Sequence, residues 1–225
     1  MLTDLSDQTL VALIGMGGGI LLGLAARLGR FCTLGAIEDL LYQNSSLRMR
    51  MWGVAIAVAI IGSFALLQTG LLPWDKTFYL GSRWNPLASI FGGAMFGYGM
   101  ALAGNCGYGA LARLGGGDLR SFLIVLVMGL SAYVTLGGPL SGLRIWAFGT
   151  YVHPAATSSY AQALSALSGL SVNVAGMAIG AIILALTLVN RDMRRSFTHV
   201  FWGAVVGLSI VSGWAGTQWV AAHGF

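Results

Sequence analysis

The residues of this chain best suited to chemistry are its two cysteines, Cys32 and Cys106. Each lies in a copy of one apolar, glycine-rich stretch. The first copy, over residues 18–40, reads GGILLGLAARLGRFCTLGAIEDL, and the second, over residues 92–114, reads GGAMFGYGMALAGNCGYGALARL. A constant shift of 74 residues aligns the two copies without a gap. A repeat that places two thiols at equivalent positions in apolar segments predicts a substrate path through a membrane, lined by both thiols.

The thiol group suits a particular kind of ligand. It is a weak hydrogen-bond donor, and it matches a soft, polarizable sulfur ligand better than a hydroxyl or a carboxylate does. Any single cysteine can also be a small apolar residue that packs well between glycine-rich helices. The equivalent positions of Cys32 and Cys106 in two copies favour the functional interpretation over the packing one.

Charged and polar residues near the cysteines extend the candidate site. A charge at the bilayer centre costs at least about 2.5–3.5 kcal/mol, so Arg30 and Arg113 either face a cavity or snorkel to the interface. In a cavity they would offset the charge of an anion, and backbone N–H groups at the start of a half-helix after each cysteine would add to this. Asn105 could donate a further hydrogen bond or make a contact between helices. The candidate substrate path comprises Cys32, Cys106, Gly104, Asn105, Gly107, Arg30 and Arg113.

Other reactive residue types form no recognisable site. Gly115, Gly116 and Gly117 lack the lysine of a phosphate-binding loop, and the chain has no Ser-His-Asp constellation or cluster of metal ligands. We therefore expect no catalytic residue, no metal and no cofactor. Arg48 lies in a polar loop distant in sequence from both thiols, so its substitution is expected to be nearly neutral.

The composition predicts an all-α integral membrane protein. Of 225 residues, 56% are hydrophobic and 8% are charged, whereas a soluble domain is about one quarter charged. Most of the uncharged runs reach the roughly 20 residues of a membrane-spanning helix. These runs cover residues 8–26, 51–74, 84–112, 121–143, 145–190 and 196–218. The net charge of +5 comes from arginines at segment ends, next to lipid headgroups, and does not indicate nucleic-acid binding.

Small residues predict how these helices approach one another. Pairs of glycines four residues apart allow close helix packing in lipid. The pairs are Gly19 with Gly23, Gly93 with Gly97, Gly176 with Gly180, and Gly203 with Gly207.

Each copy is expected to form an apolar segment, a break at the cysteine, a short second helix and a full span. If each broken pair enters the membrane and returns, one span separates the copies, which are then inverted with their site near the midplane. We thus predict one transmembrane domain over residues 1–225, with inverted repeats and broken or re-entrant helices around a central path. Repeat one covers about residues 10–72, repeat two about 84–136, and further spans cover about 172–189 and 199–220.

The remaining segments set the expected topology. Trp74, Tyr79 and Trp84 of the linker between the copies suit an interfacial belt, and residues 137–160 are expected to form a loop. The N-terminus has no basic region and does not indicate a cleaved signal peptide. On the turned-back topology, one side carries Lys76, Arg83, Arg113, Arg120, Arg191, Arg194 and Arg195, and the other carries Arg48, Arg50 and Arg144. The richer side should be cytoplasmic, which places the N-terminus in the periplasm.

The stretches GRFCTLGAIEDL and AGNCGYGALARLGGGDLRS resemble signatures of the YeeE/YedE family of inner-membrane sulfur transporters, and the resemblance covers nearly the whole chain. It implies uptake of thiosulfate or a related sulfur anion, passed along cysteines through S–H contacts. It also implies a soluble sulfur carrier of the TusA type as a cytoplasmic partner. Family members are usually longer and carry a further cysteine in a motif like GCTIGQG, which this chain lacks.

Two functions remain open at this stage. The preferred one is a transporter or channel for a sulfur oxyanion, which is not an enzyme. The alternative is a membrane-bound thiol protein that transfers sulfur as a persulfide to a soluble carrier. A transferring thiol needs a lowered pKa and access to its partner, whereas a conduit thiol needs only a lined path.

Overall fold

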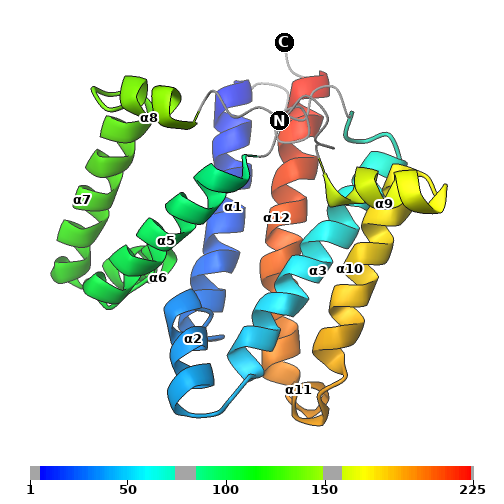
Figure 1. The fold of residues 1–225 in the computed structure, drawn as a ribbon, viewed down its shortest axis with the longest axis horizontal. Coiled ribbons are helices and arrows are strands. Elements are labelled where there is room, and N and C mark those ends of the chain that lie inside the picture. The colour runs from blue at the N-terminus through cyan, green and yellow to red at the C-terminus, as the bar shows by residue number, and fades with distance from the viewer. Residues whose placement is uncertain (1–5, 74–84, 149–158, 224–225) are drawn as a thin grey trace. The chain divides into compact units, whose positions relative to one another are not determined.

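The chain is all-helical over the residues that the structure, a computed structural model, describes: 6–73, 85–148 and 159–223 (Figure 1). The helices are α1 (Asp7–Arg27), α2 (Thr33–Tyr42), α3 (Leu47–Gln68), α5 (Pro86–Ala103), α6 (Gly107–Gly115), α7 (Leu119–Leu136), α8 (Ser141–Phe148), α9 (Tyr160–Ser168), α10 (Val172–Leu188), α11 (Arg191–Arg195) and α12 (Phe197–His223). By length and composition, 5 candidate membrane spans occur in this part of the chain, or up to 6 if the bent pair α9–α10 is one span. The prediction of an all-α protein with several membrane spans is confirmed.

The helices form two compact units. The first contains Met1–Phe31, Gly35–Gly81 and Ser159–Phe225, and the second contains Cys32–Leu34 and Ser82–Ser158. The three-residue segment Cys32–Leu34 thus belongs to the second unit, although α1 and most of α2 belong to the first.

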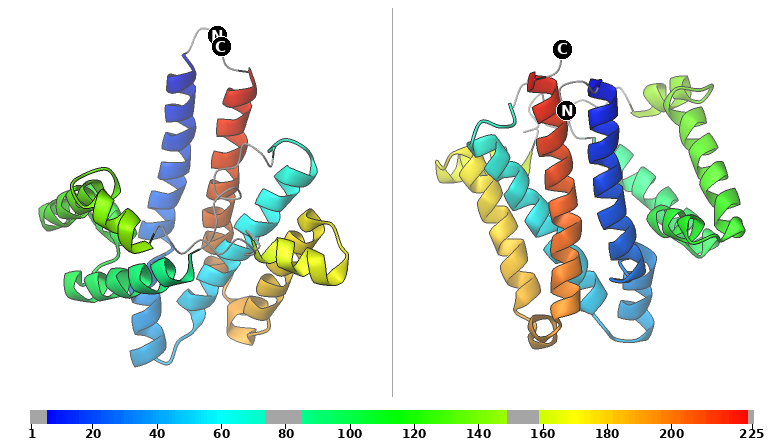
Figure 2. Two further views of the ribbon diagram at one scale, coloured as in Figure 1. Left: turned by 45° about the horizontal axis from the view of Figure 1, so that its top comes forward. Right: turned by 180° about the vertical axis from the view of Figure 1, so that it is seen from behind.

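In the first unit, α3 packs against both α10 and α12, and α12 packs against α1 (Figure 2). The short helices α2 and α11 lie at one end of this unit, while α1 begins and α12 ends at the other. The outer surfaces of these helices stay apolar, as they do in proteins whose solvent is lipid.

Glycines make the close contacts of this unit. A Cβ on Gly203 would lie 2.8 Å from the Met51 carbonyl oxygen, and a Cβ on Gly207 would lie 2.7 Å from that of Ala55. Gly176 and Gly180 likewise face side chains of α3. Two of the four predicted glycine pairs therefore bring helices together.

The other two predicted glycine pairs do not pack. Around Gly19, Gly23, Gly93 and Gly97, no described atom lies within 4 Å of an added Cβ. The prediction that these pairs bring helices together is therefore wrong for the described residues.

The second unit contains the second cysteine. Pro86 stands in the first turn of α5, and the Asn85 side chain caps that helix by accepting from the Ala88 N–H at 3.1 Å. Together α5 and α6 form one candidate span of 30 residues, Pro86–Gly115, interrupted at residues 104–106. The span is broken but not turned back as the sequence predicts. The pair that bends, by 110°, is α9–α10.

Three further expectations concern the stretch after α7, the linker between the copies and the orientation of the copies. The stretch after α7, expected to be a loop, contains the helix α8. The aromatic belt of the linker lies outside the described residues. An inverted arrangement of the copies needs an odd number of crossings before α5, whereas α1 and α3 are two candidate spans. The orientation of the copies stays a prediction.

We predict that Gly207→Ala lowers stability by about 1–3 kcal/mol, because the added methyl group meets the backbone of α3 and cannot be accommodated by a side-chain rotation. Gly213→Ala, on the same helix with no described atom within 4 Å, is the matched control and should be neutral. Thermal unfolding midpoints in detergent compare the two variants. Equal midpoints would contradict the packing of α12 on α3.

Candidate functional site

Each cysteine immediately precedes a short helix. Cys32 is followed by α2, which begins at Thr33, and Cys106 is the N-cap of α6. The Cys106 sulfur accepts a hydrogen bond from the Gly109 N–H at 3.2 Å. The first N–H groups of a helix lack partners within it, and a serine or aspartate oxygen usually accepts from one of them. Here the Cys106 sulfur is that acceptor.

The two breaks share one feature of backbone conformation. Arg30 has φ 53° and Gly104 has φ 61°, so in each copy the backbone enters the left-handed region two residues before the cysteine. Gly104 ends α5 in this conformation, which is common for glycine at a helix C-terminus. Arg30 occupies the equivalent position of the first copy although it is not a glycine. The 74-residue repeat thus extends to the sign of φ at this position, although α5 continues two residues further than α1 does.

The two sulfur atoms lie side by side within the second unit. Cys32 Sγ and Cys106 Sγ are 3.4 Å apart, and neither cysteine is in a disulfide. Backbone N–H groups of Thr33 and Leu34, at the start of α2, also interact with the Cys106 sulfur. Cys106 is buried and Cys32 is partly exposed. Two thiols and the N–H groups of two helix starts therefore converge on one point.

The neighbours of Cys106 pack tightly around it. Asn105 is 5% exposed, and its Nδ2 atom has no hydrogen-bond partner among the described residues. A Cβ on Gly109 would collide with Asn105 Oδ1, and a Cβ on Gly107 would lie 2.8 Å from Met128 Sδ. The glycines that follow the cysteine are thus needed for close approach, while Asn105 keeps an unused donor beside the thiol.

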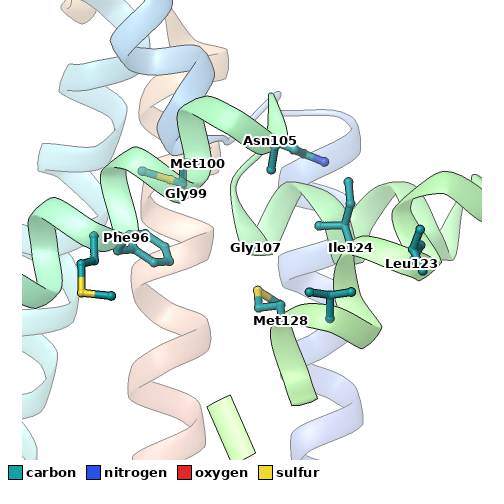
Figure 3. Close-up of a pocket in the computed structure, with 11 residues that line it drawn as sticks. Phe96, Gly99, Met100, Asn105, Gly107, Leu123, Ile124 and Met128 are labelled. Atoms are coloured by element: carbon teal, nitrogen blue, oxygen red, sulfur yellow. The ribbon is translucent and has the colours of Figure 1, made fainter. Parts of the chain in front are cut away.

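A cavity of about 510 Å³ adjoins this point in the second unit (Figure 3). Side chains of α5, among them Phe96 and Met100, and of α7, among them Ile124 and Met128, line it together with Asn105 and Gly107. The lining is almost entirely apolar and offers little stabilisation to a doubly charged anion. The cavity is therefore a poor site for such an anion.

A model of the protein family described as sulphur transport matches residues 28–224 of the chain. The chain belongs to this sulphur transport family. The resemblance to the YeeE/YedE proteins that the cysteine-containing stretches indicate is thereby confirmed.

Several curated proteins are similar to this member of the sulphur transport family. A thiosulfate transporter, TsuA, of Spirochaeta thermophila is 27% identical over 206 residues, covering 88% of this chain and 61% of the relative. TsuA of Escherichia coli is 33% identical over 132 residues, covering 59% of this chain and 36% of the relative. A probable transporter, YedE, of Salmonella typhimurium is 29% identical over 117 residues, covering 52% of this chain and 26% of the relative. The chain thus spans less than two thirds of these relatives, and no solved structure matches it.

The two arginines of the candidate path, Arg30 and Arg113, are exposed in this family member. Among the described residues, no hydrogen bond joins either side chain to a cysteine. Arg113 is in the last turn of α6, close enough to Asp118 to contribute to its electrostatics. The Ser121 hydroxyl, which donates to Asp118 at 2.9 Å, is the main cause of the lowered pKa of that carboxyl. A role of either arginine in anion binding stays a prediction.

Arg48 is the residue whose importance the sequence does not reveal. Instead of lying in a remote polar loop, it belongs to α3 and makes hydrogen bonds on both sides of Cys32 in sequence. The expectation that its substitution is neutral is therefore wrong in its premise. A contact between residues 18 positions apart produces no periodic pattern in the sequence. The glycine at position 35 is the one feature of the sequence that reflects the contact, because a Cβ there would collide with the Arg48 guanidinium.

We predict that a mild oxidant such as copper phenanthroline joins Cys32 to Cys106 in membranes, because their sulfurs are 3.4 Å apart. Two thiols lose two protons, and two electrons pass to the copper complex, which leaves a disulfide. The chain has only two cysteines, so a maleimide gel-shift reagent should add two labels before oxidation and none after it. Cys32→Ala should keep one label throughout. Persistence of both labels in the parent chain would contradict the juxtaposition.

Proposed function

We propose that this member of the sulphur transport family takes up thiosulfate or a related sulfur anion across the inner membrane, along a path that includes Cys32 and Cys106. The observation that carries the proposal is the meeting of the two repeat-related thiols, 3.4 Å apart, at two helix starts. Two of the relatives support the substrate class, since both are called thiosulfate transporters.

The chemistry of such an anion fits the two kinds of group gathered here. Its terminal sulfur is soft and polarizable, so it can accept S–H hydrogen bonds from Cys32 and Cys106 with little loss of hydration. Its oxygens carry charge that suits backbone N–H groups and the positive end of a helix dipole. A thiol therefore selects the sulfur end of the anion, and the helix starts stabilise the oxyanion end.

The geometry disfavours the alternative in which a persulfide is carried on one cysteine. A persulfide on Cys106 would lie beside the Cys32 thiol, which can attack the inner sulfur. That attack forms the Cys32–Cys106 disulfide and expels the outer sulfur as sulfide, so the transferable sulfur is lost. A paired thiol suits non-covalent passage better than storage of a persulfide. Detection of a stable persulfide on either residue by mass spectrometry would reverse this preference.

We also propose a TusA-like soluble sulfur carrier as a cytoplasmic partner. The support for this partner is the resemblance of the cysteine-containing stretches to the YeeE/YedE family, which implies such a carrier.

We predict that Cys106→Ala reduces initial uptake of radiolabelled thiosulfate at least about tenfold, which corresponds to roughly 1.4 kcal/mol in the transport barrier. Cys32→Ala should behave alike, because each thiol supplies one of the two S–H donors. The assay uses cells that depend on this chain, with its amount in the membrane measured in parallel. Uptake at the parental rate in both variants would remove the thiol path.

Arg113→Gln tests whether an arginine contributes positive potential to the path. Removing the charge should raise the apparent substrate constant several-fold with little change in the amount of protein, because binding of a dianion weakens. Arg120→Gln, which removes an exposed charge from the first turn of α7, is the matched control. A substrate constant of Arg113→Gln equal to that of the parent chain would remove Arg113 from the anion path.

The candidate spans also support a proposed topology. If α1, α3, α5–α6, α7, α9–α10 and α12 each cross once, nine of the twelve basic residues lie on one side. These are Arg27, Arg30, Arg48, Arg50, Arg113, Arg120, Arg191, Arg194 and Arg195. That side should be cytoplasmic, which again places the N-terminus in the periplasm.

Reporter fusions decide this topology. Fusions after residue 45 and after residue 193 should both report a cytoplasmic location, and a fusion at the N-terminus a periplasmic one. Turned-back segments in both repeats would instead place residue 45 in the periplasm while leaving the other two unchanged. The fusion at residue 45 therefore separates crossing from re-entry, and a cytoplasmic N-terminus would contradict both.

A further inference from the structure

We propose that Arg48 is a positioning residue for Cys32: its guanidinium holds the backbone on both sides of the cysteine and so sets where the thiol stands. The inference rests on the proposed function, because it assumes that the placement of Cys32 matters for uptake. The contacts that carry it are made by Arg48 with backbone carbonyls and with Asp39. It therefore needs a readout of thiol placement that is independent of transport.

The hydrogen bonds of Arg48 bracket the cysteine. Its Nε and Nη2 atoms donate to the Arg30 carbonyl oxygen at 3.2 and 3.0 Å, and its Nη1 atom donates to the Gly35 carbonyl oxygen at 3.1 Å. Cys32 lies between these two anchored carbonyls, two residues after the first and three before the second. The same Nη1 pairs with Asp39 Oδ2 at 3.1 Å, and both side chains are largely buried, with 22% and 14% exposed. Asp39 thus orients the guanidinium while its other donors hold the break.

The backbone at the first break needs this support more than the second break does. Arg30 has φ 53°, a conformation that is strained for a residue with a Cβ. The equivalent residue of the second copy is Gly104, which adopts φ 61° without that strain. Strained residues persist only where surrounding contacts hold them. The position equivalent to Arg48 in the second copy is Phe122, which has no guanidinium to offer.

Arginine suits this role through its shape. A planar guanidinium presents several N–H donors in fixed directions, so one side chain can reach two carbonyls and a carboxylate together. Gly35 leaves the space for it, because a Cβ there would collide with the guanidinium. A lysine ammonium, as a point charge on a flexible stem, can keep the pair with Asp39 but not the full set of bonds.

The experiment compares Arg48→Gln with a matched control from the same helix. Arg50 also donates to two carbonyl oxygens, those of Leu186 at 2.9 Å and Thr187 at 3.1 Å, but these belong to α10 and not to the cysteine break. Three quantities are measured for each variant in the full chain. They are the rate of Cys32–Cys106 disulfide formation with copper phenanthroline, the thermal unfolding midpoint, and initial uptake of thiosulfate.

We expect Arg48→Gln to slow disulfide formation at least about tenfold, because reaction between two groups depends steeply on their alignment. Uptake should fall with it. Arg50→Gln should lower the unfolding midpoint while leaving the rate of disulfide formation unchanged. Arg48→Lys should lie between the parent chain and Arg48→Gln, and it carries the test if Arg48→Gln does not insert into the membrane.

A second-site substitution separates positioning from general damage. Arg30→Gly gives the first break the glycine that the second already has, so it should restore part of the disulfide-formation rate in an Arg48→Gln chain. Only this rate is used for the rescue, since Arg30 is itself a candidate for the anion path. A merely structural loss at Arg48 would not be repaired by relieving one dihedral angle.

The outcomes separate this inference from the proposed function. Unchanged disulfide formation in Arg48→Gln, an equal slowing in Arg50→Gln, or no rescue by Arg30→Gly would each overturn the positioning role. Slower disulfide formation with parental uptake would leave Arg48 as the residue that positions Cys32 and would contradict the thiol path instead.

Discussion

A helix can be interrupted inside a membrane only if the N–H and C=O groups freed by the break find other partners. At both cysteines of this protein, nearby side chains supply such partners. At the second break, the Cys106 sulfur accepts from the amide of Gly109 and interacts with amides at the start of α2. At the first, the freed carbonyl of Arg30 accepts from Arg48. The groups that satisfy the backbone are therefore the groups that shape the candidate site.

The two units differ in how their helices pack. In the first, α3 is held by α10 and α12 through glycines that bring backbones within reach of each other, and few polar groups are involved. This packing is a source of rigidity, because small residues leave no side chain that could adjust. In the second, α5 has no buried residue. The tight glycine packing thus belongs to the first unit, whereas both cysteines belong to the second.

Much of this organisation could be predicted from the sequence, because it depends on periodic or local patterns. Uncharged apolar runs predict the spans, and the gapless repeat predicts that Cys32 and Cys106 belong together. What could not be predicted depends on direction or distance. Whether the chain turns back after Cys106 is decided by the angle at a three-residue break, and α5 and α6 run on as one span. Whether Gly19 packs is decided by what lies opposite it, which spacing alone does not encode. The contacts of Arg48 could not be predicted for the same reason, since its partners lie 9 to 18 residues away in sequence.

The hydrogen bonds from the Arg48 side chain to the Arg30 carbonyl have a consequence for how the two copies of the repeat diverged. If both copies descend from one ancestral segment with glycine at the left-handed position, as at Gly104, then an arginine arriving at position 30 imposed a strain that glycine did not. The bonds from Arg48 would offset that strain, so the change costs less stability in a chain that already carries the guanidinium. Losing Arg48 afterwards would expose the strain again. On this view the two halves of the duplication are no longer interchangeable, and among related chains an arginine at position 30 should occur more often with an arginine at position 48 than without one.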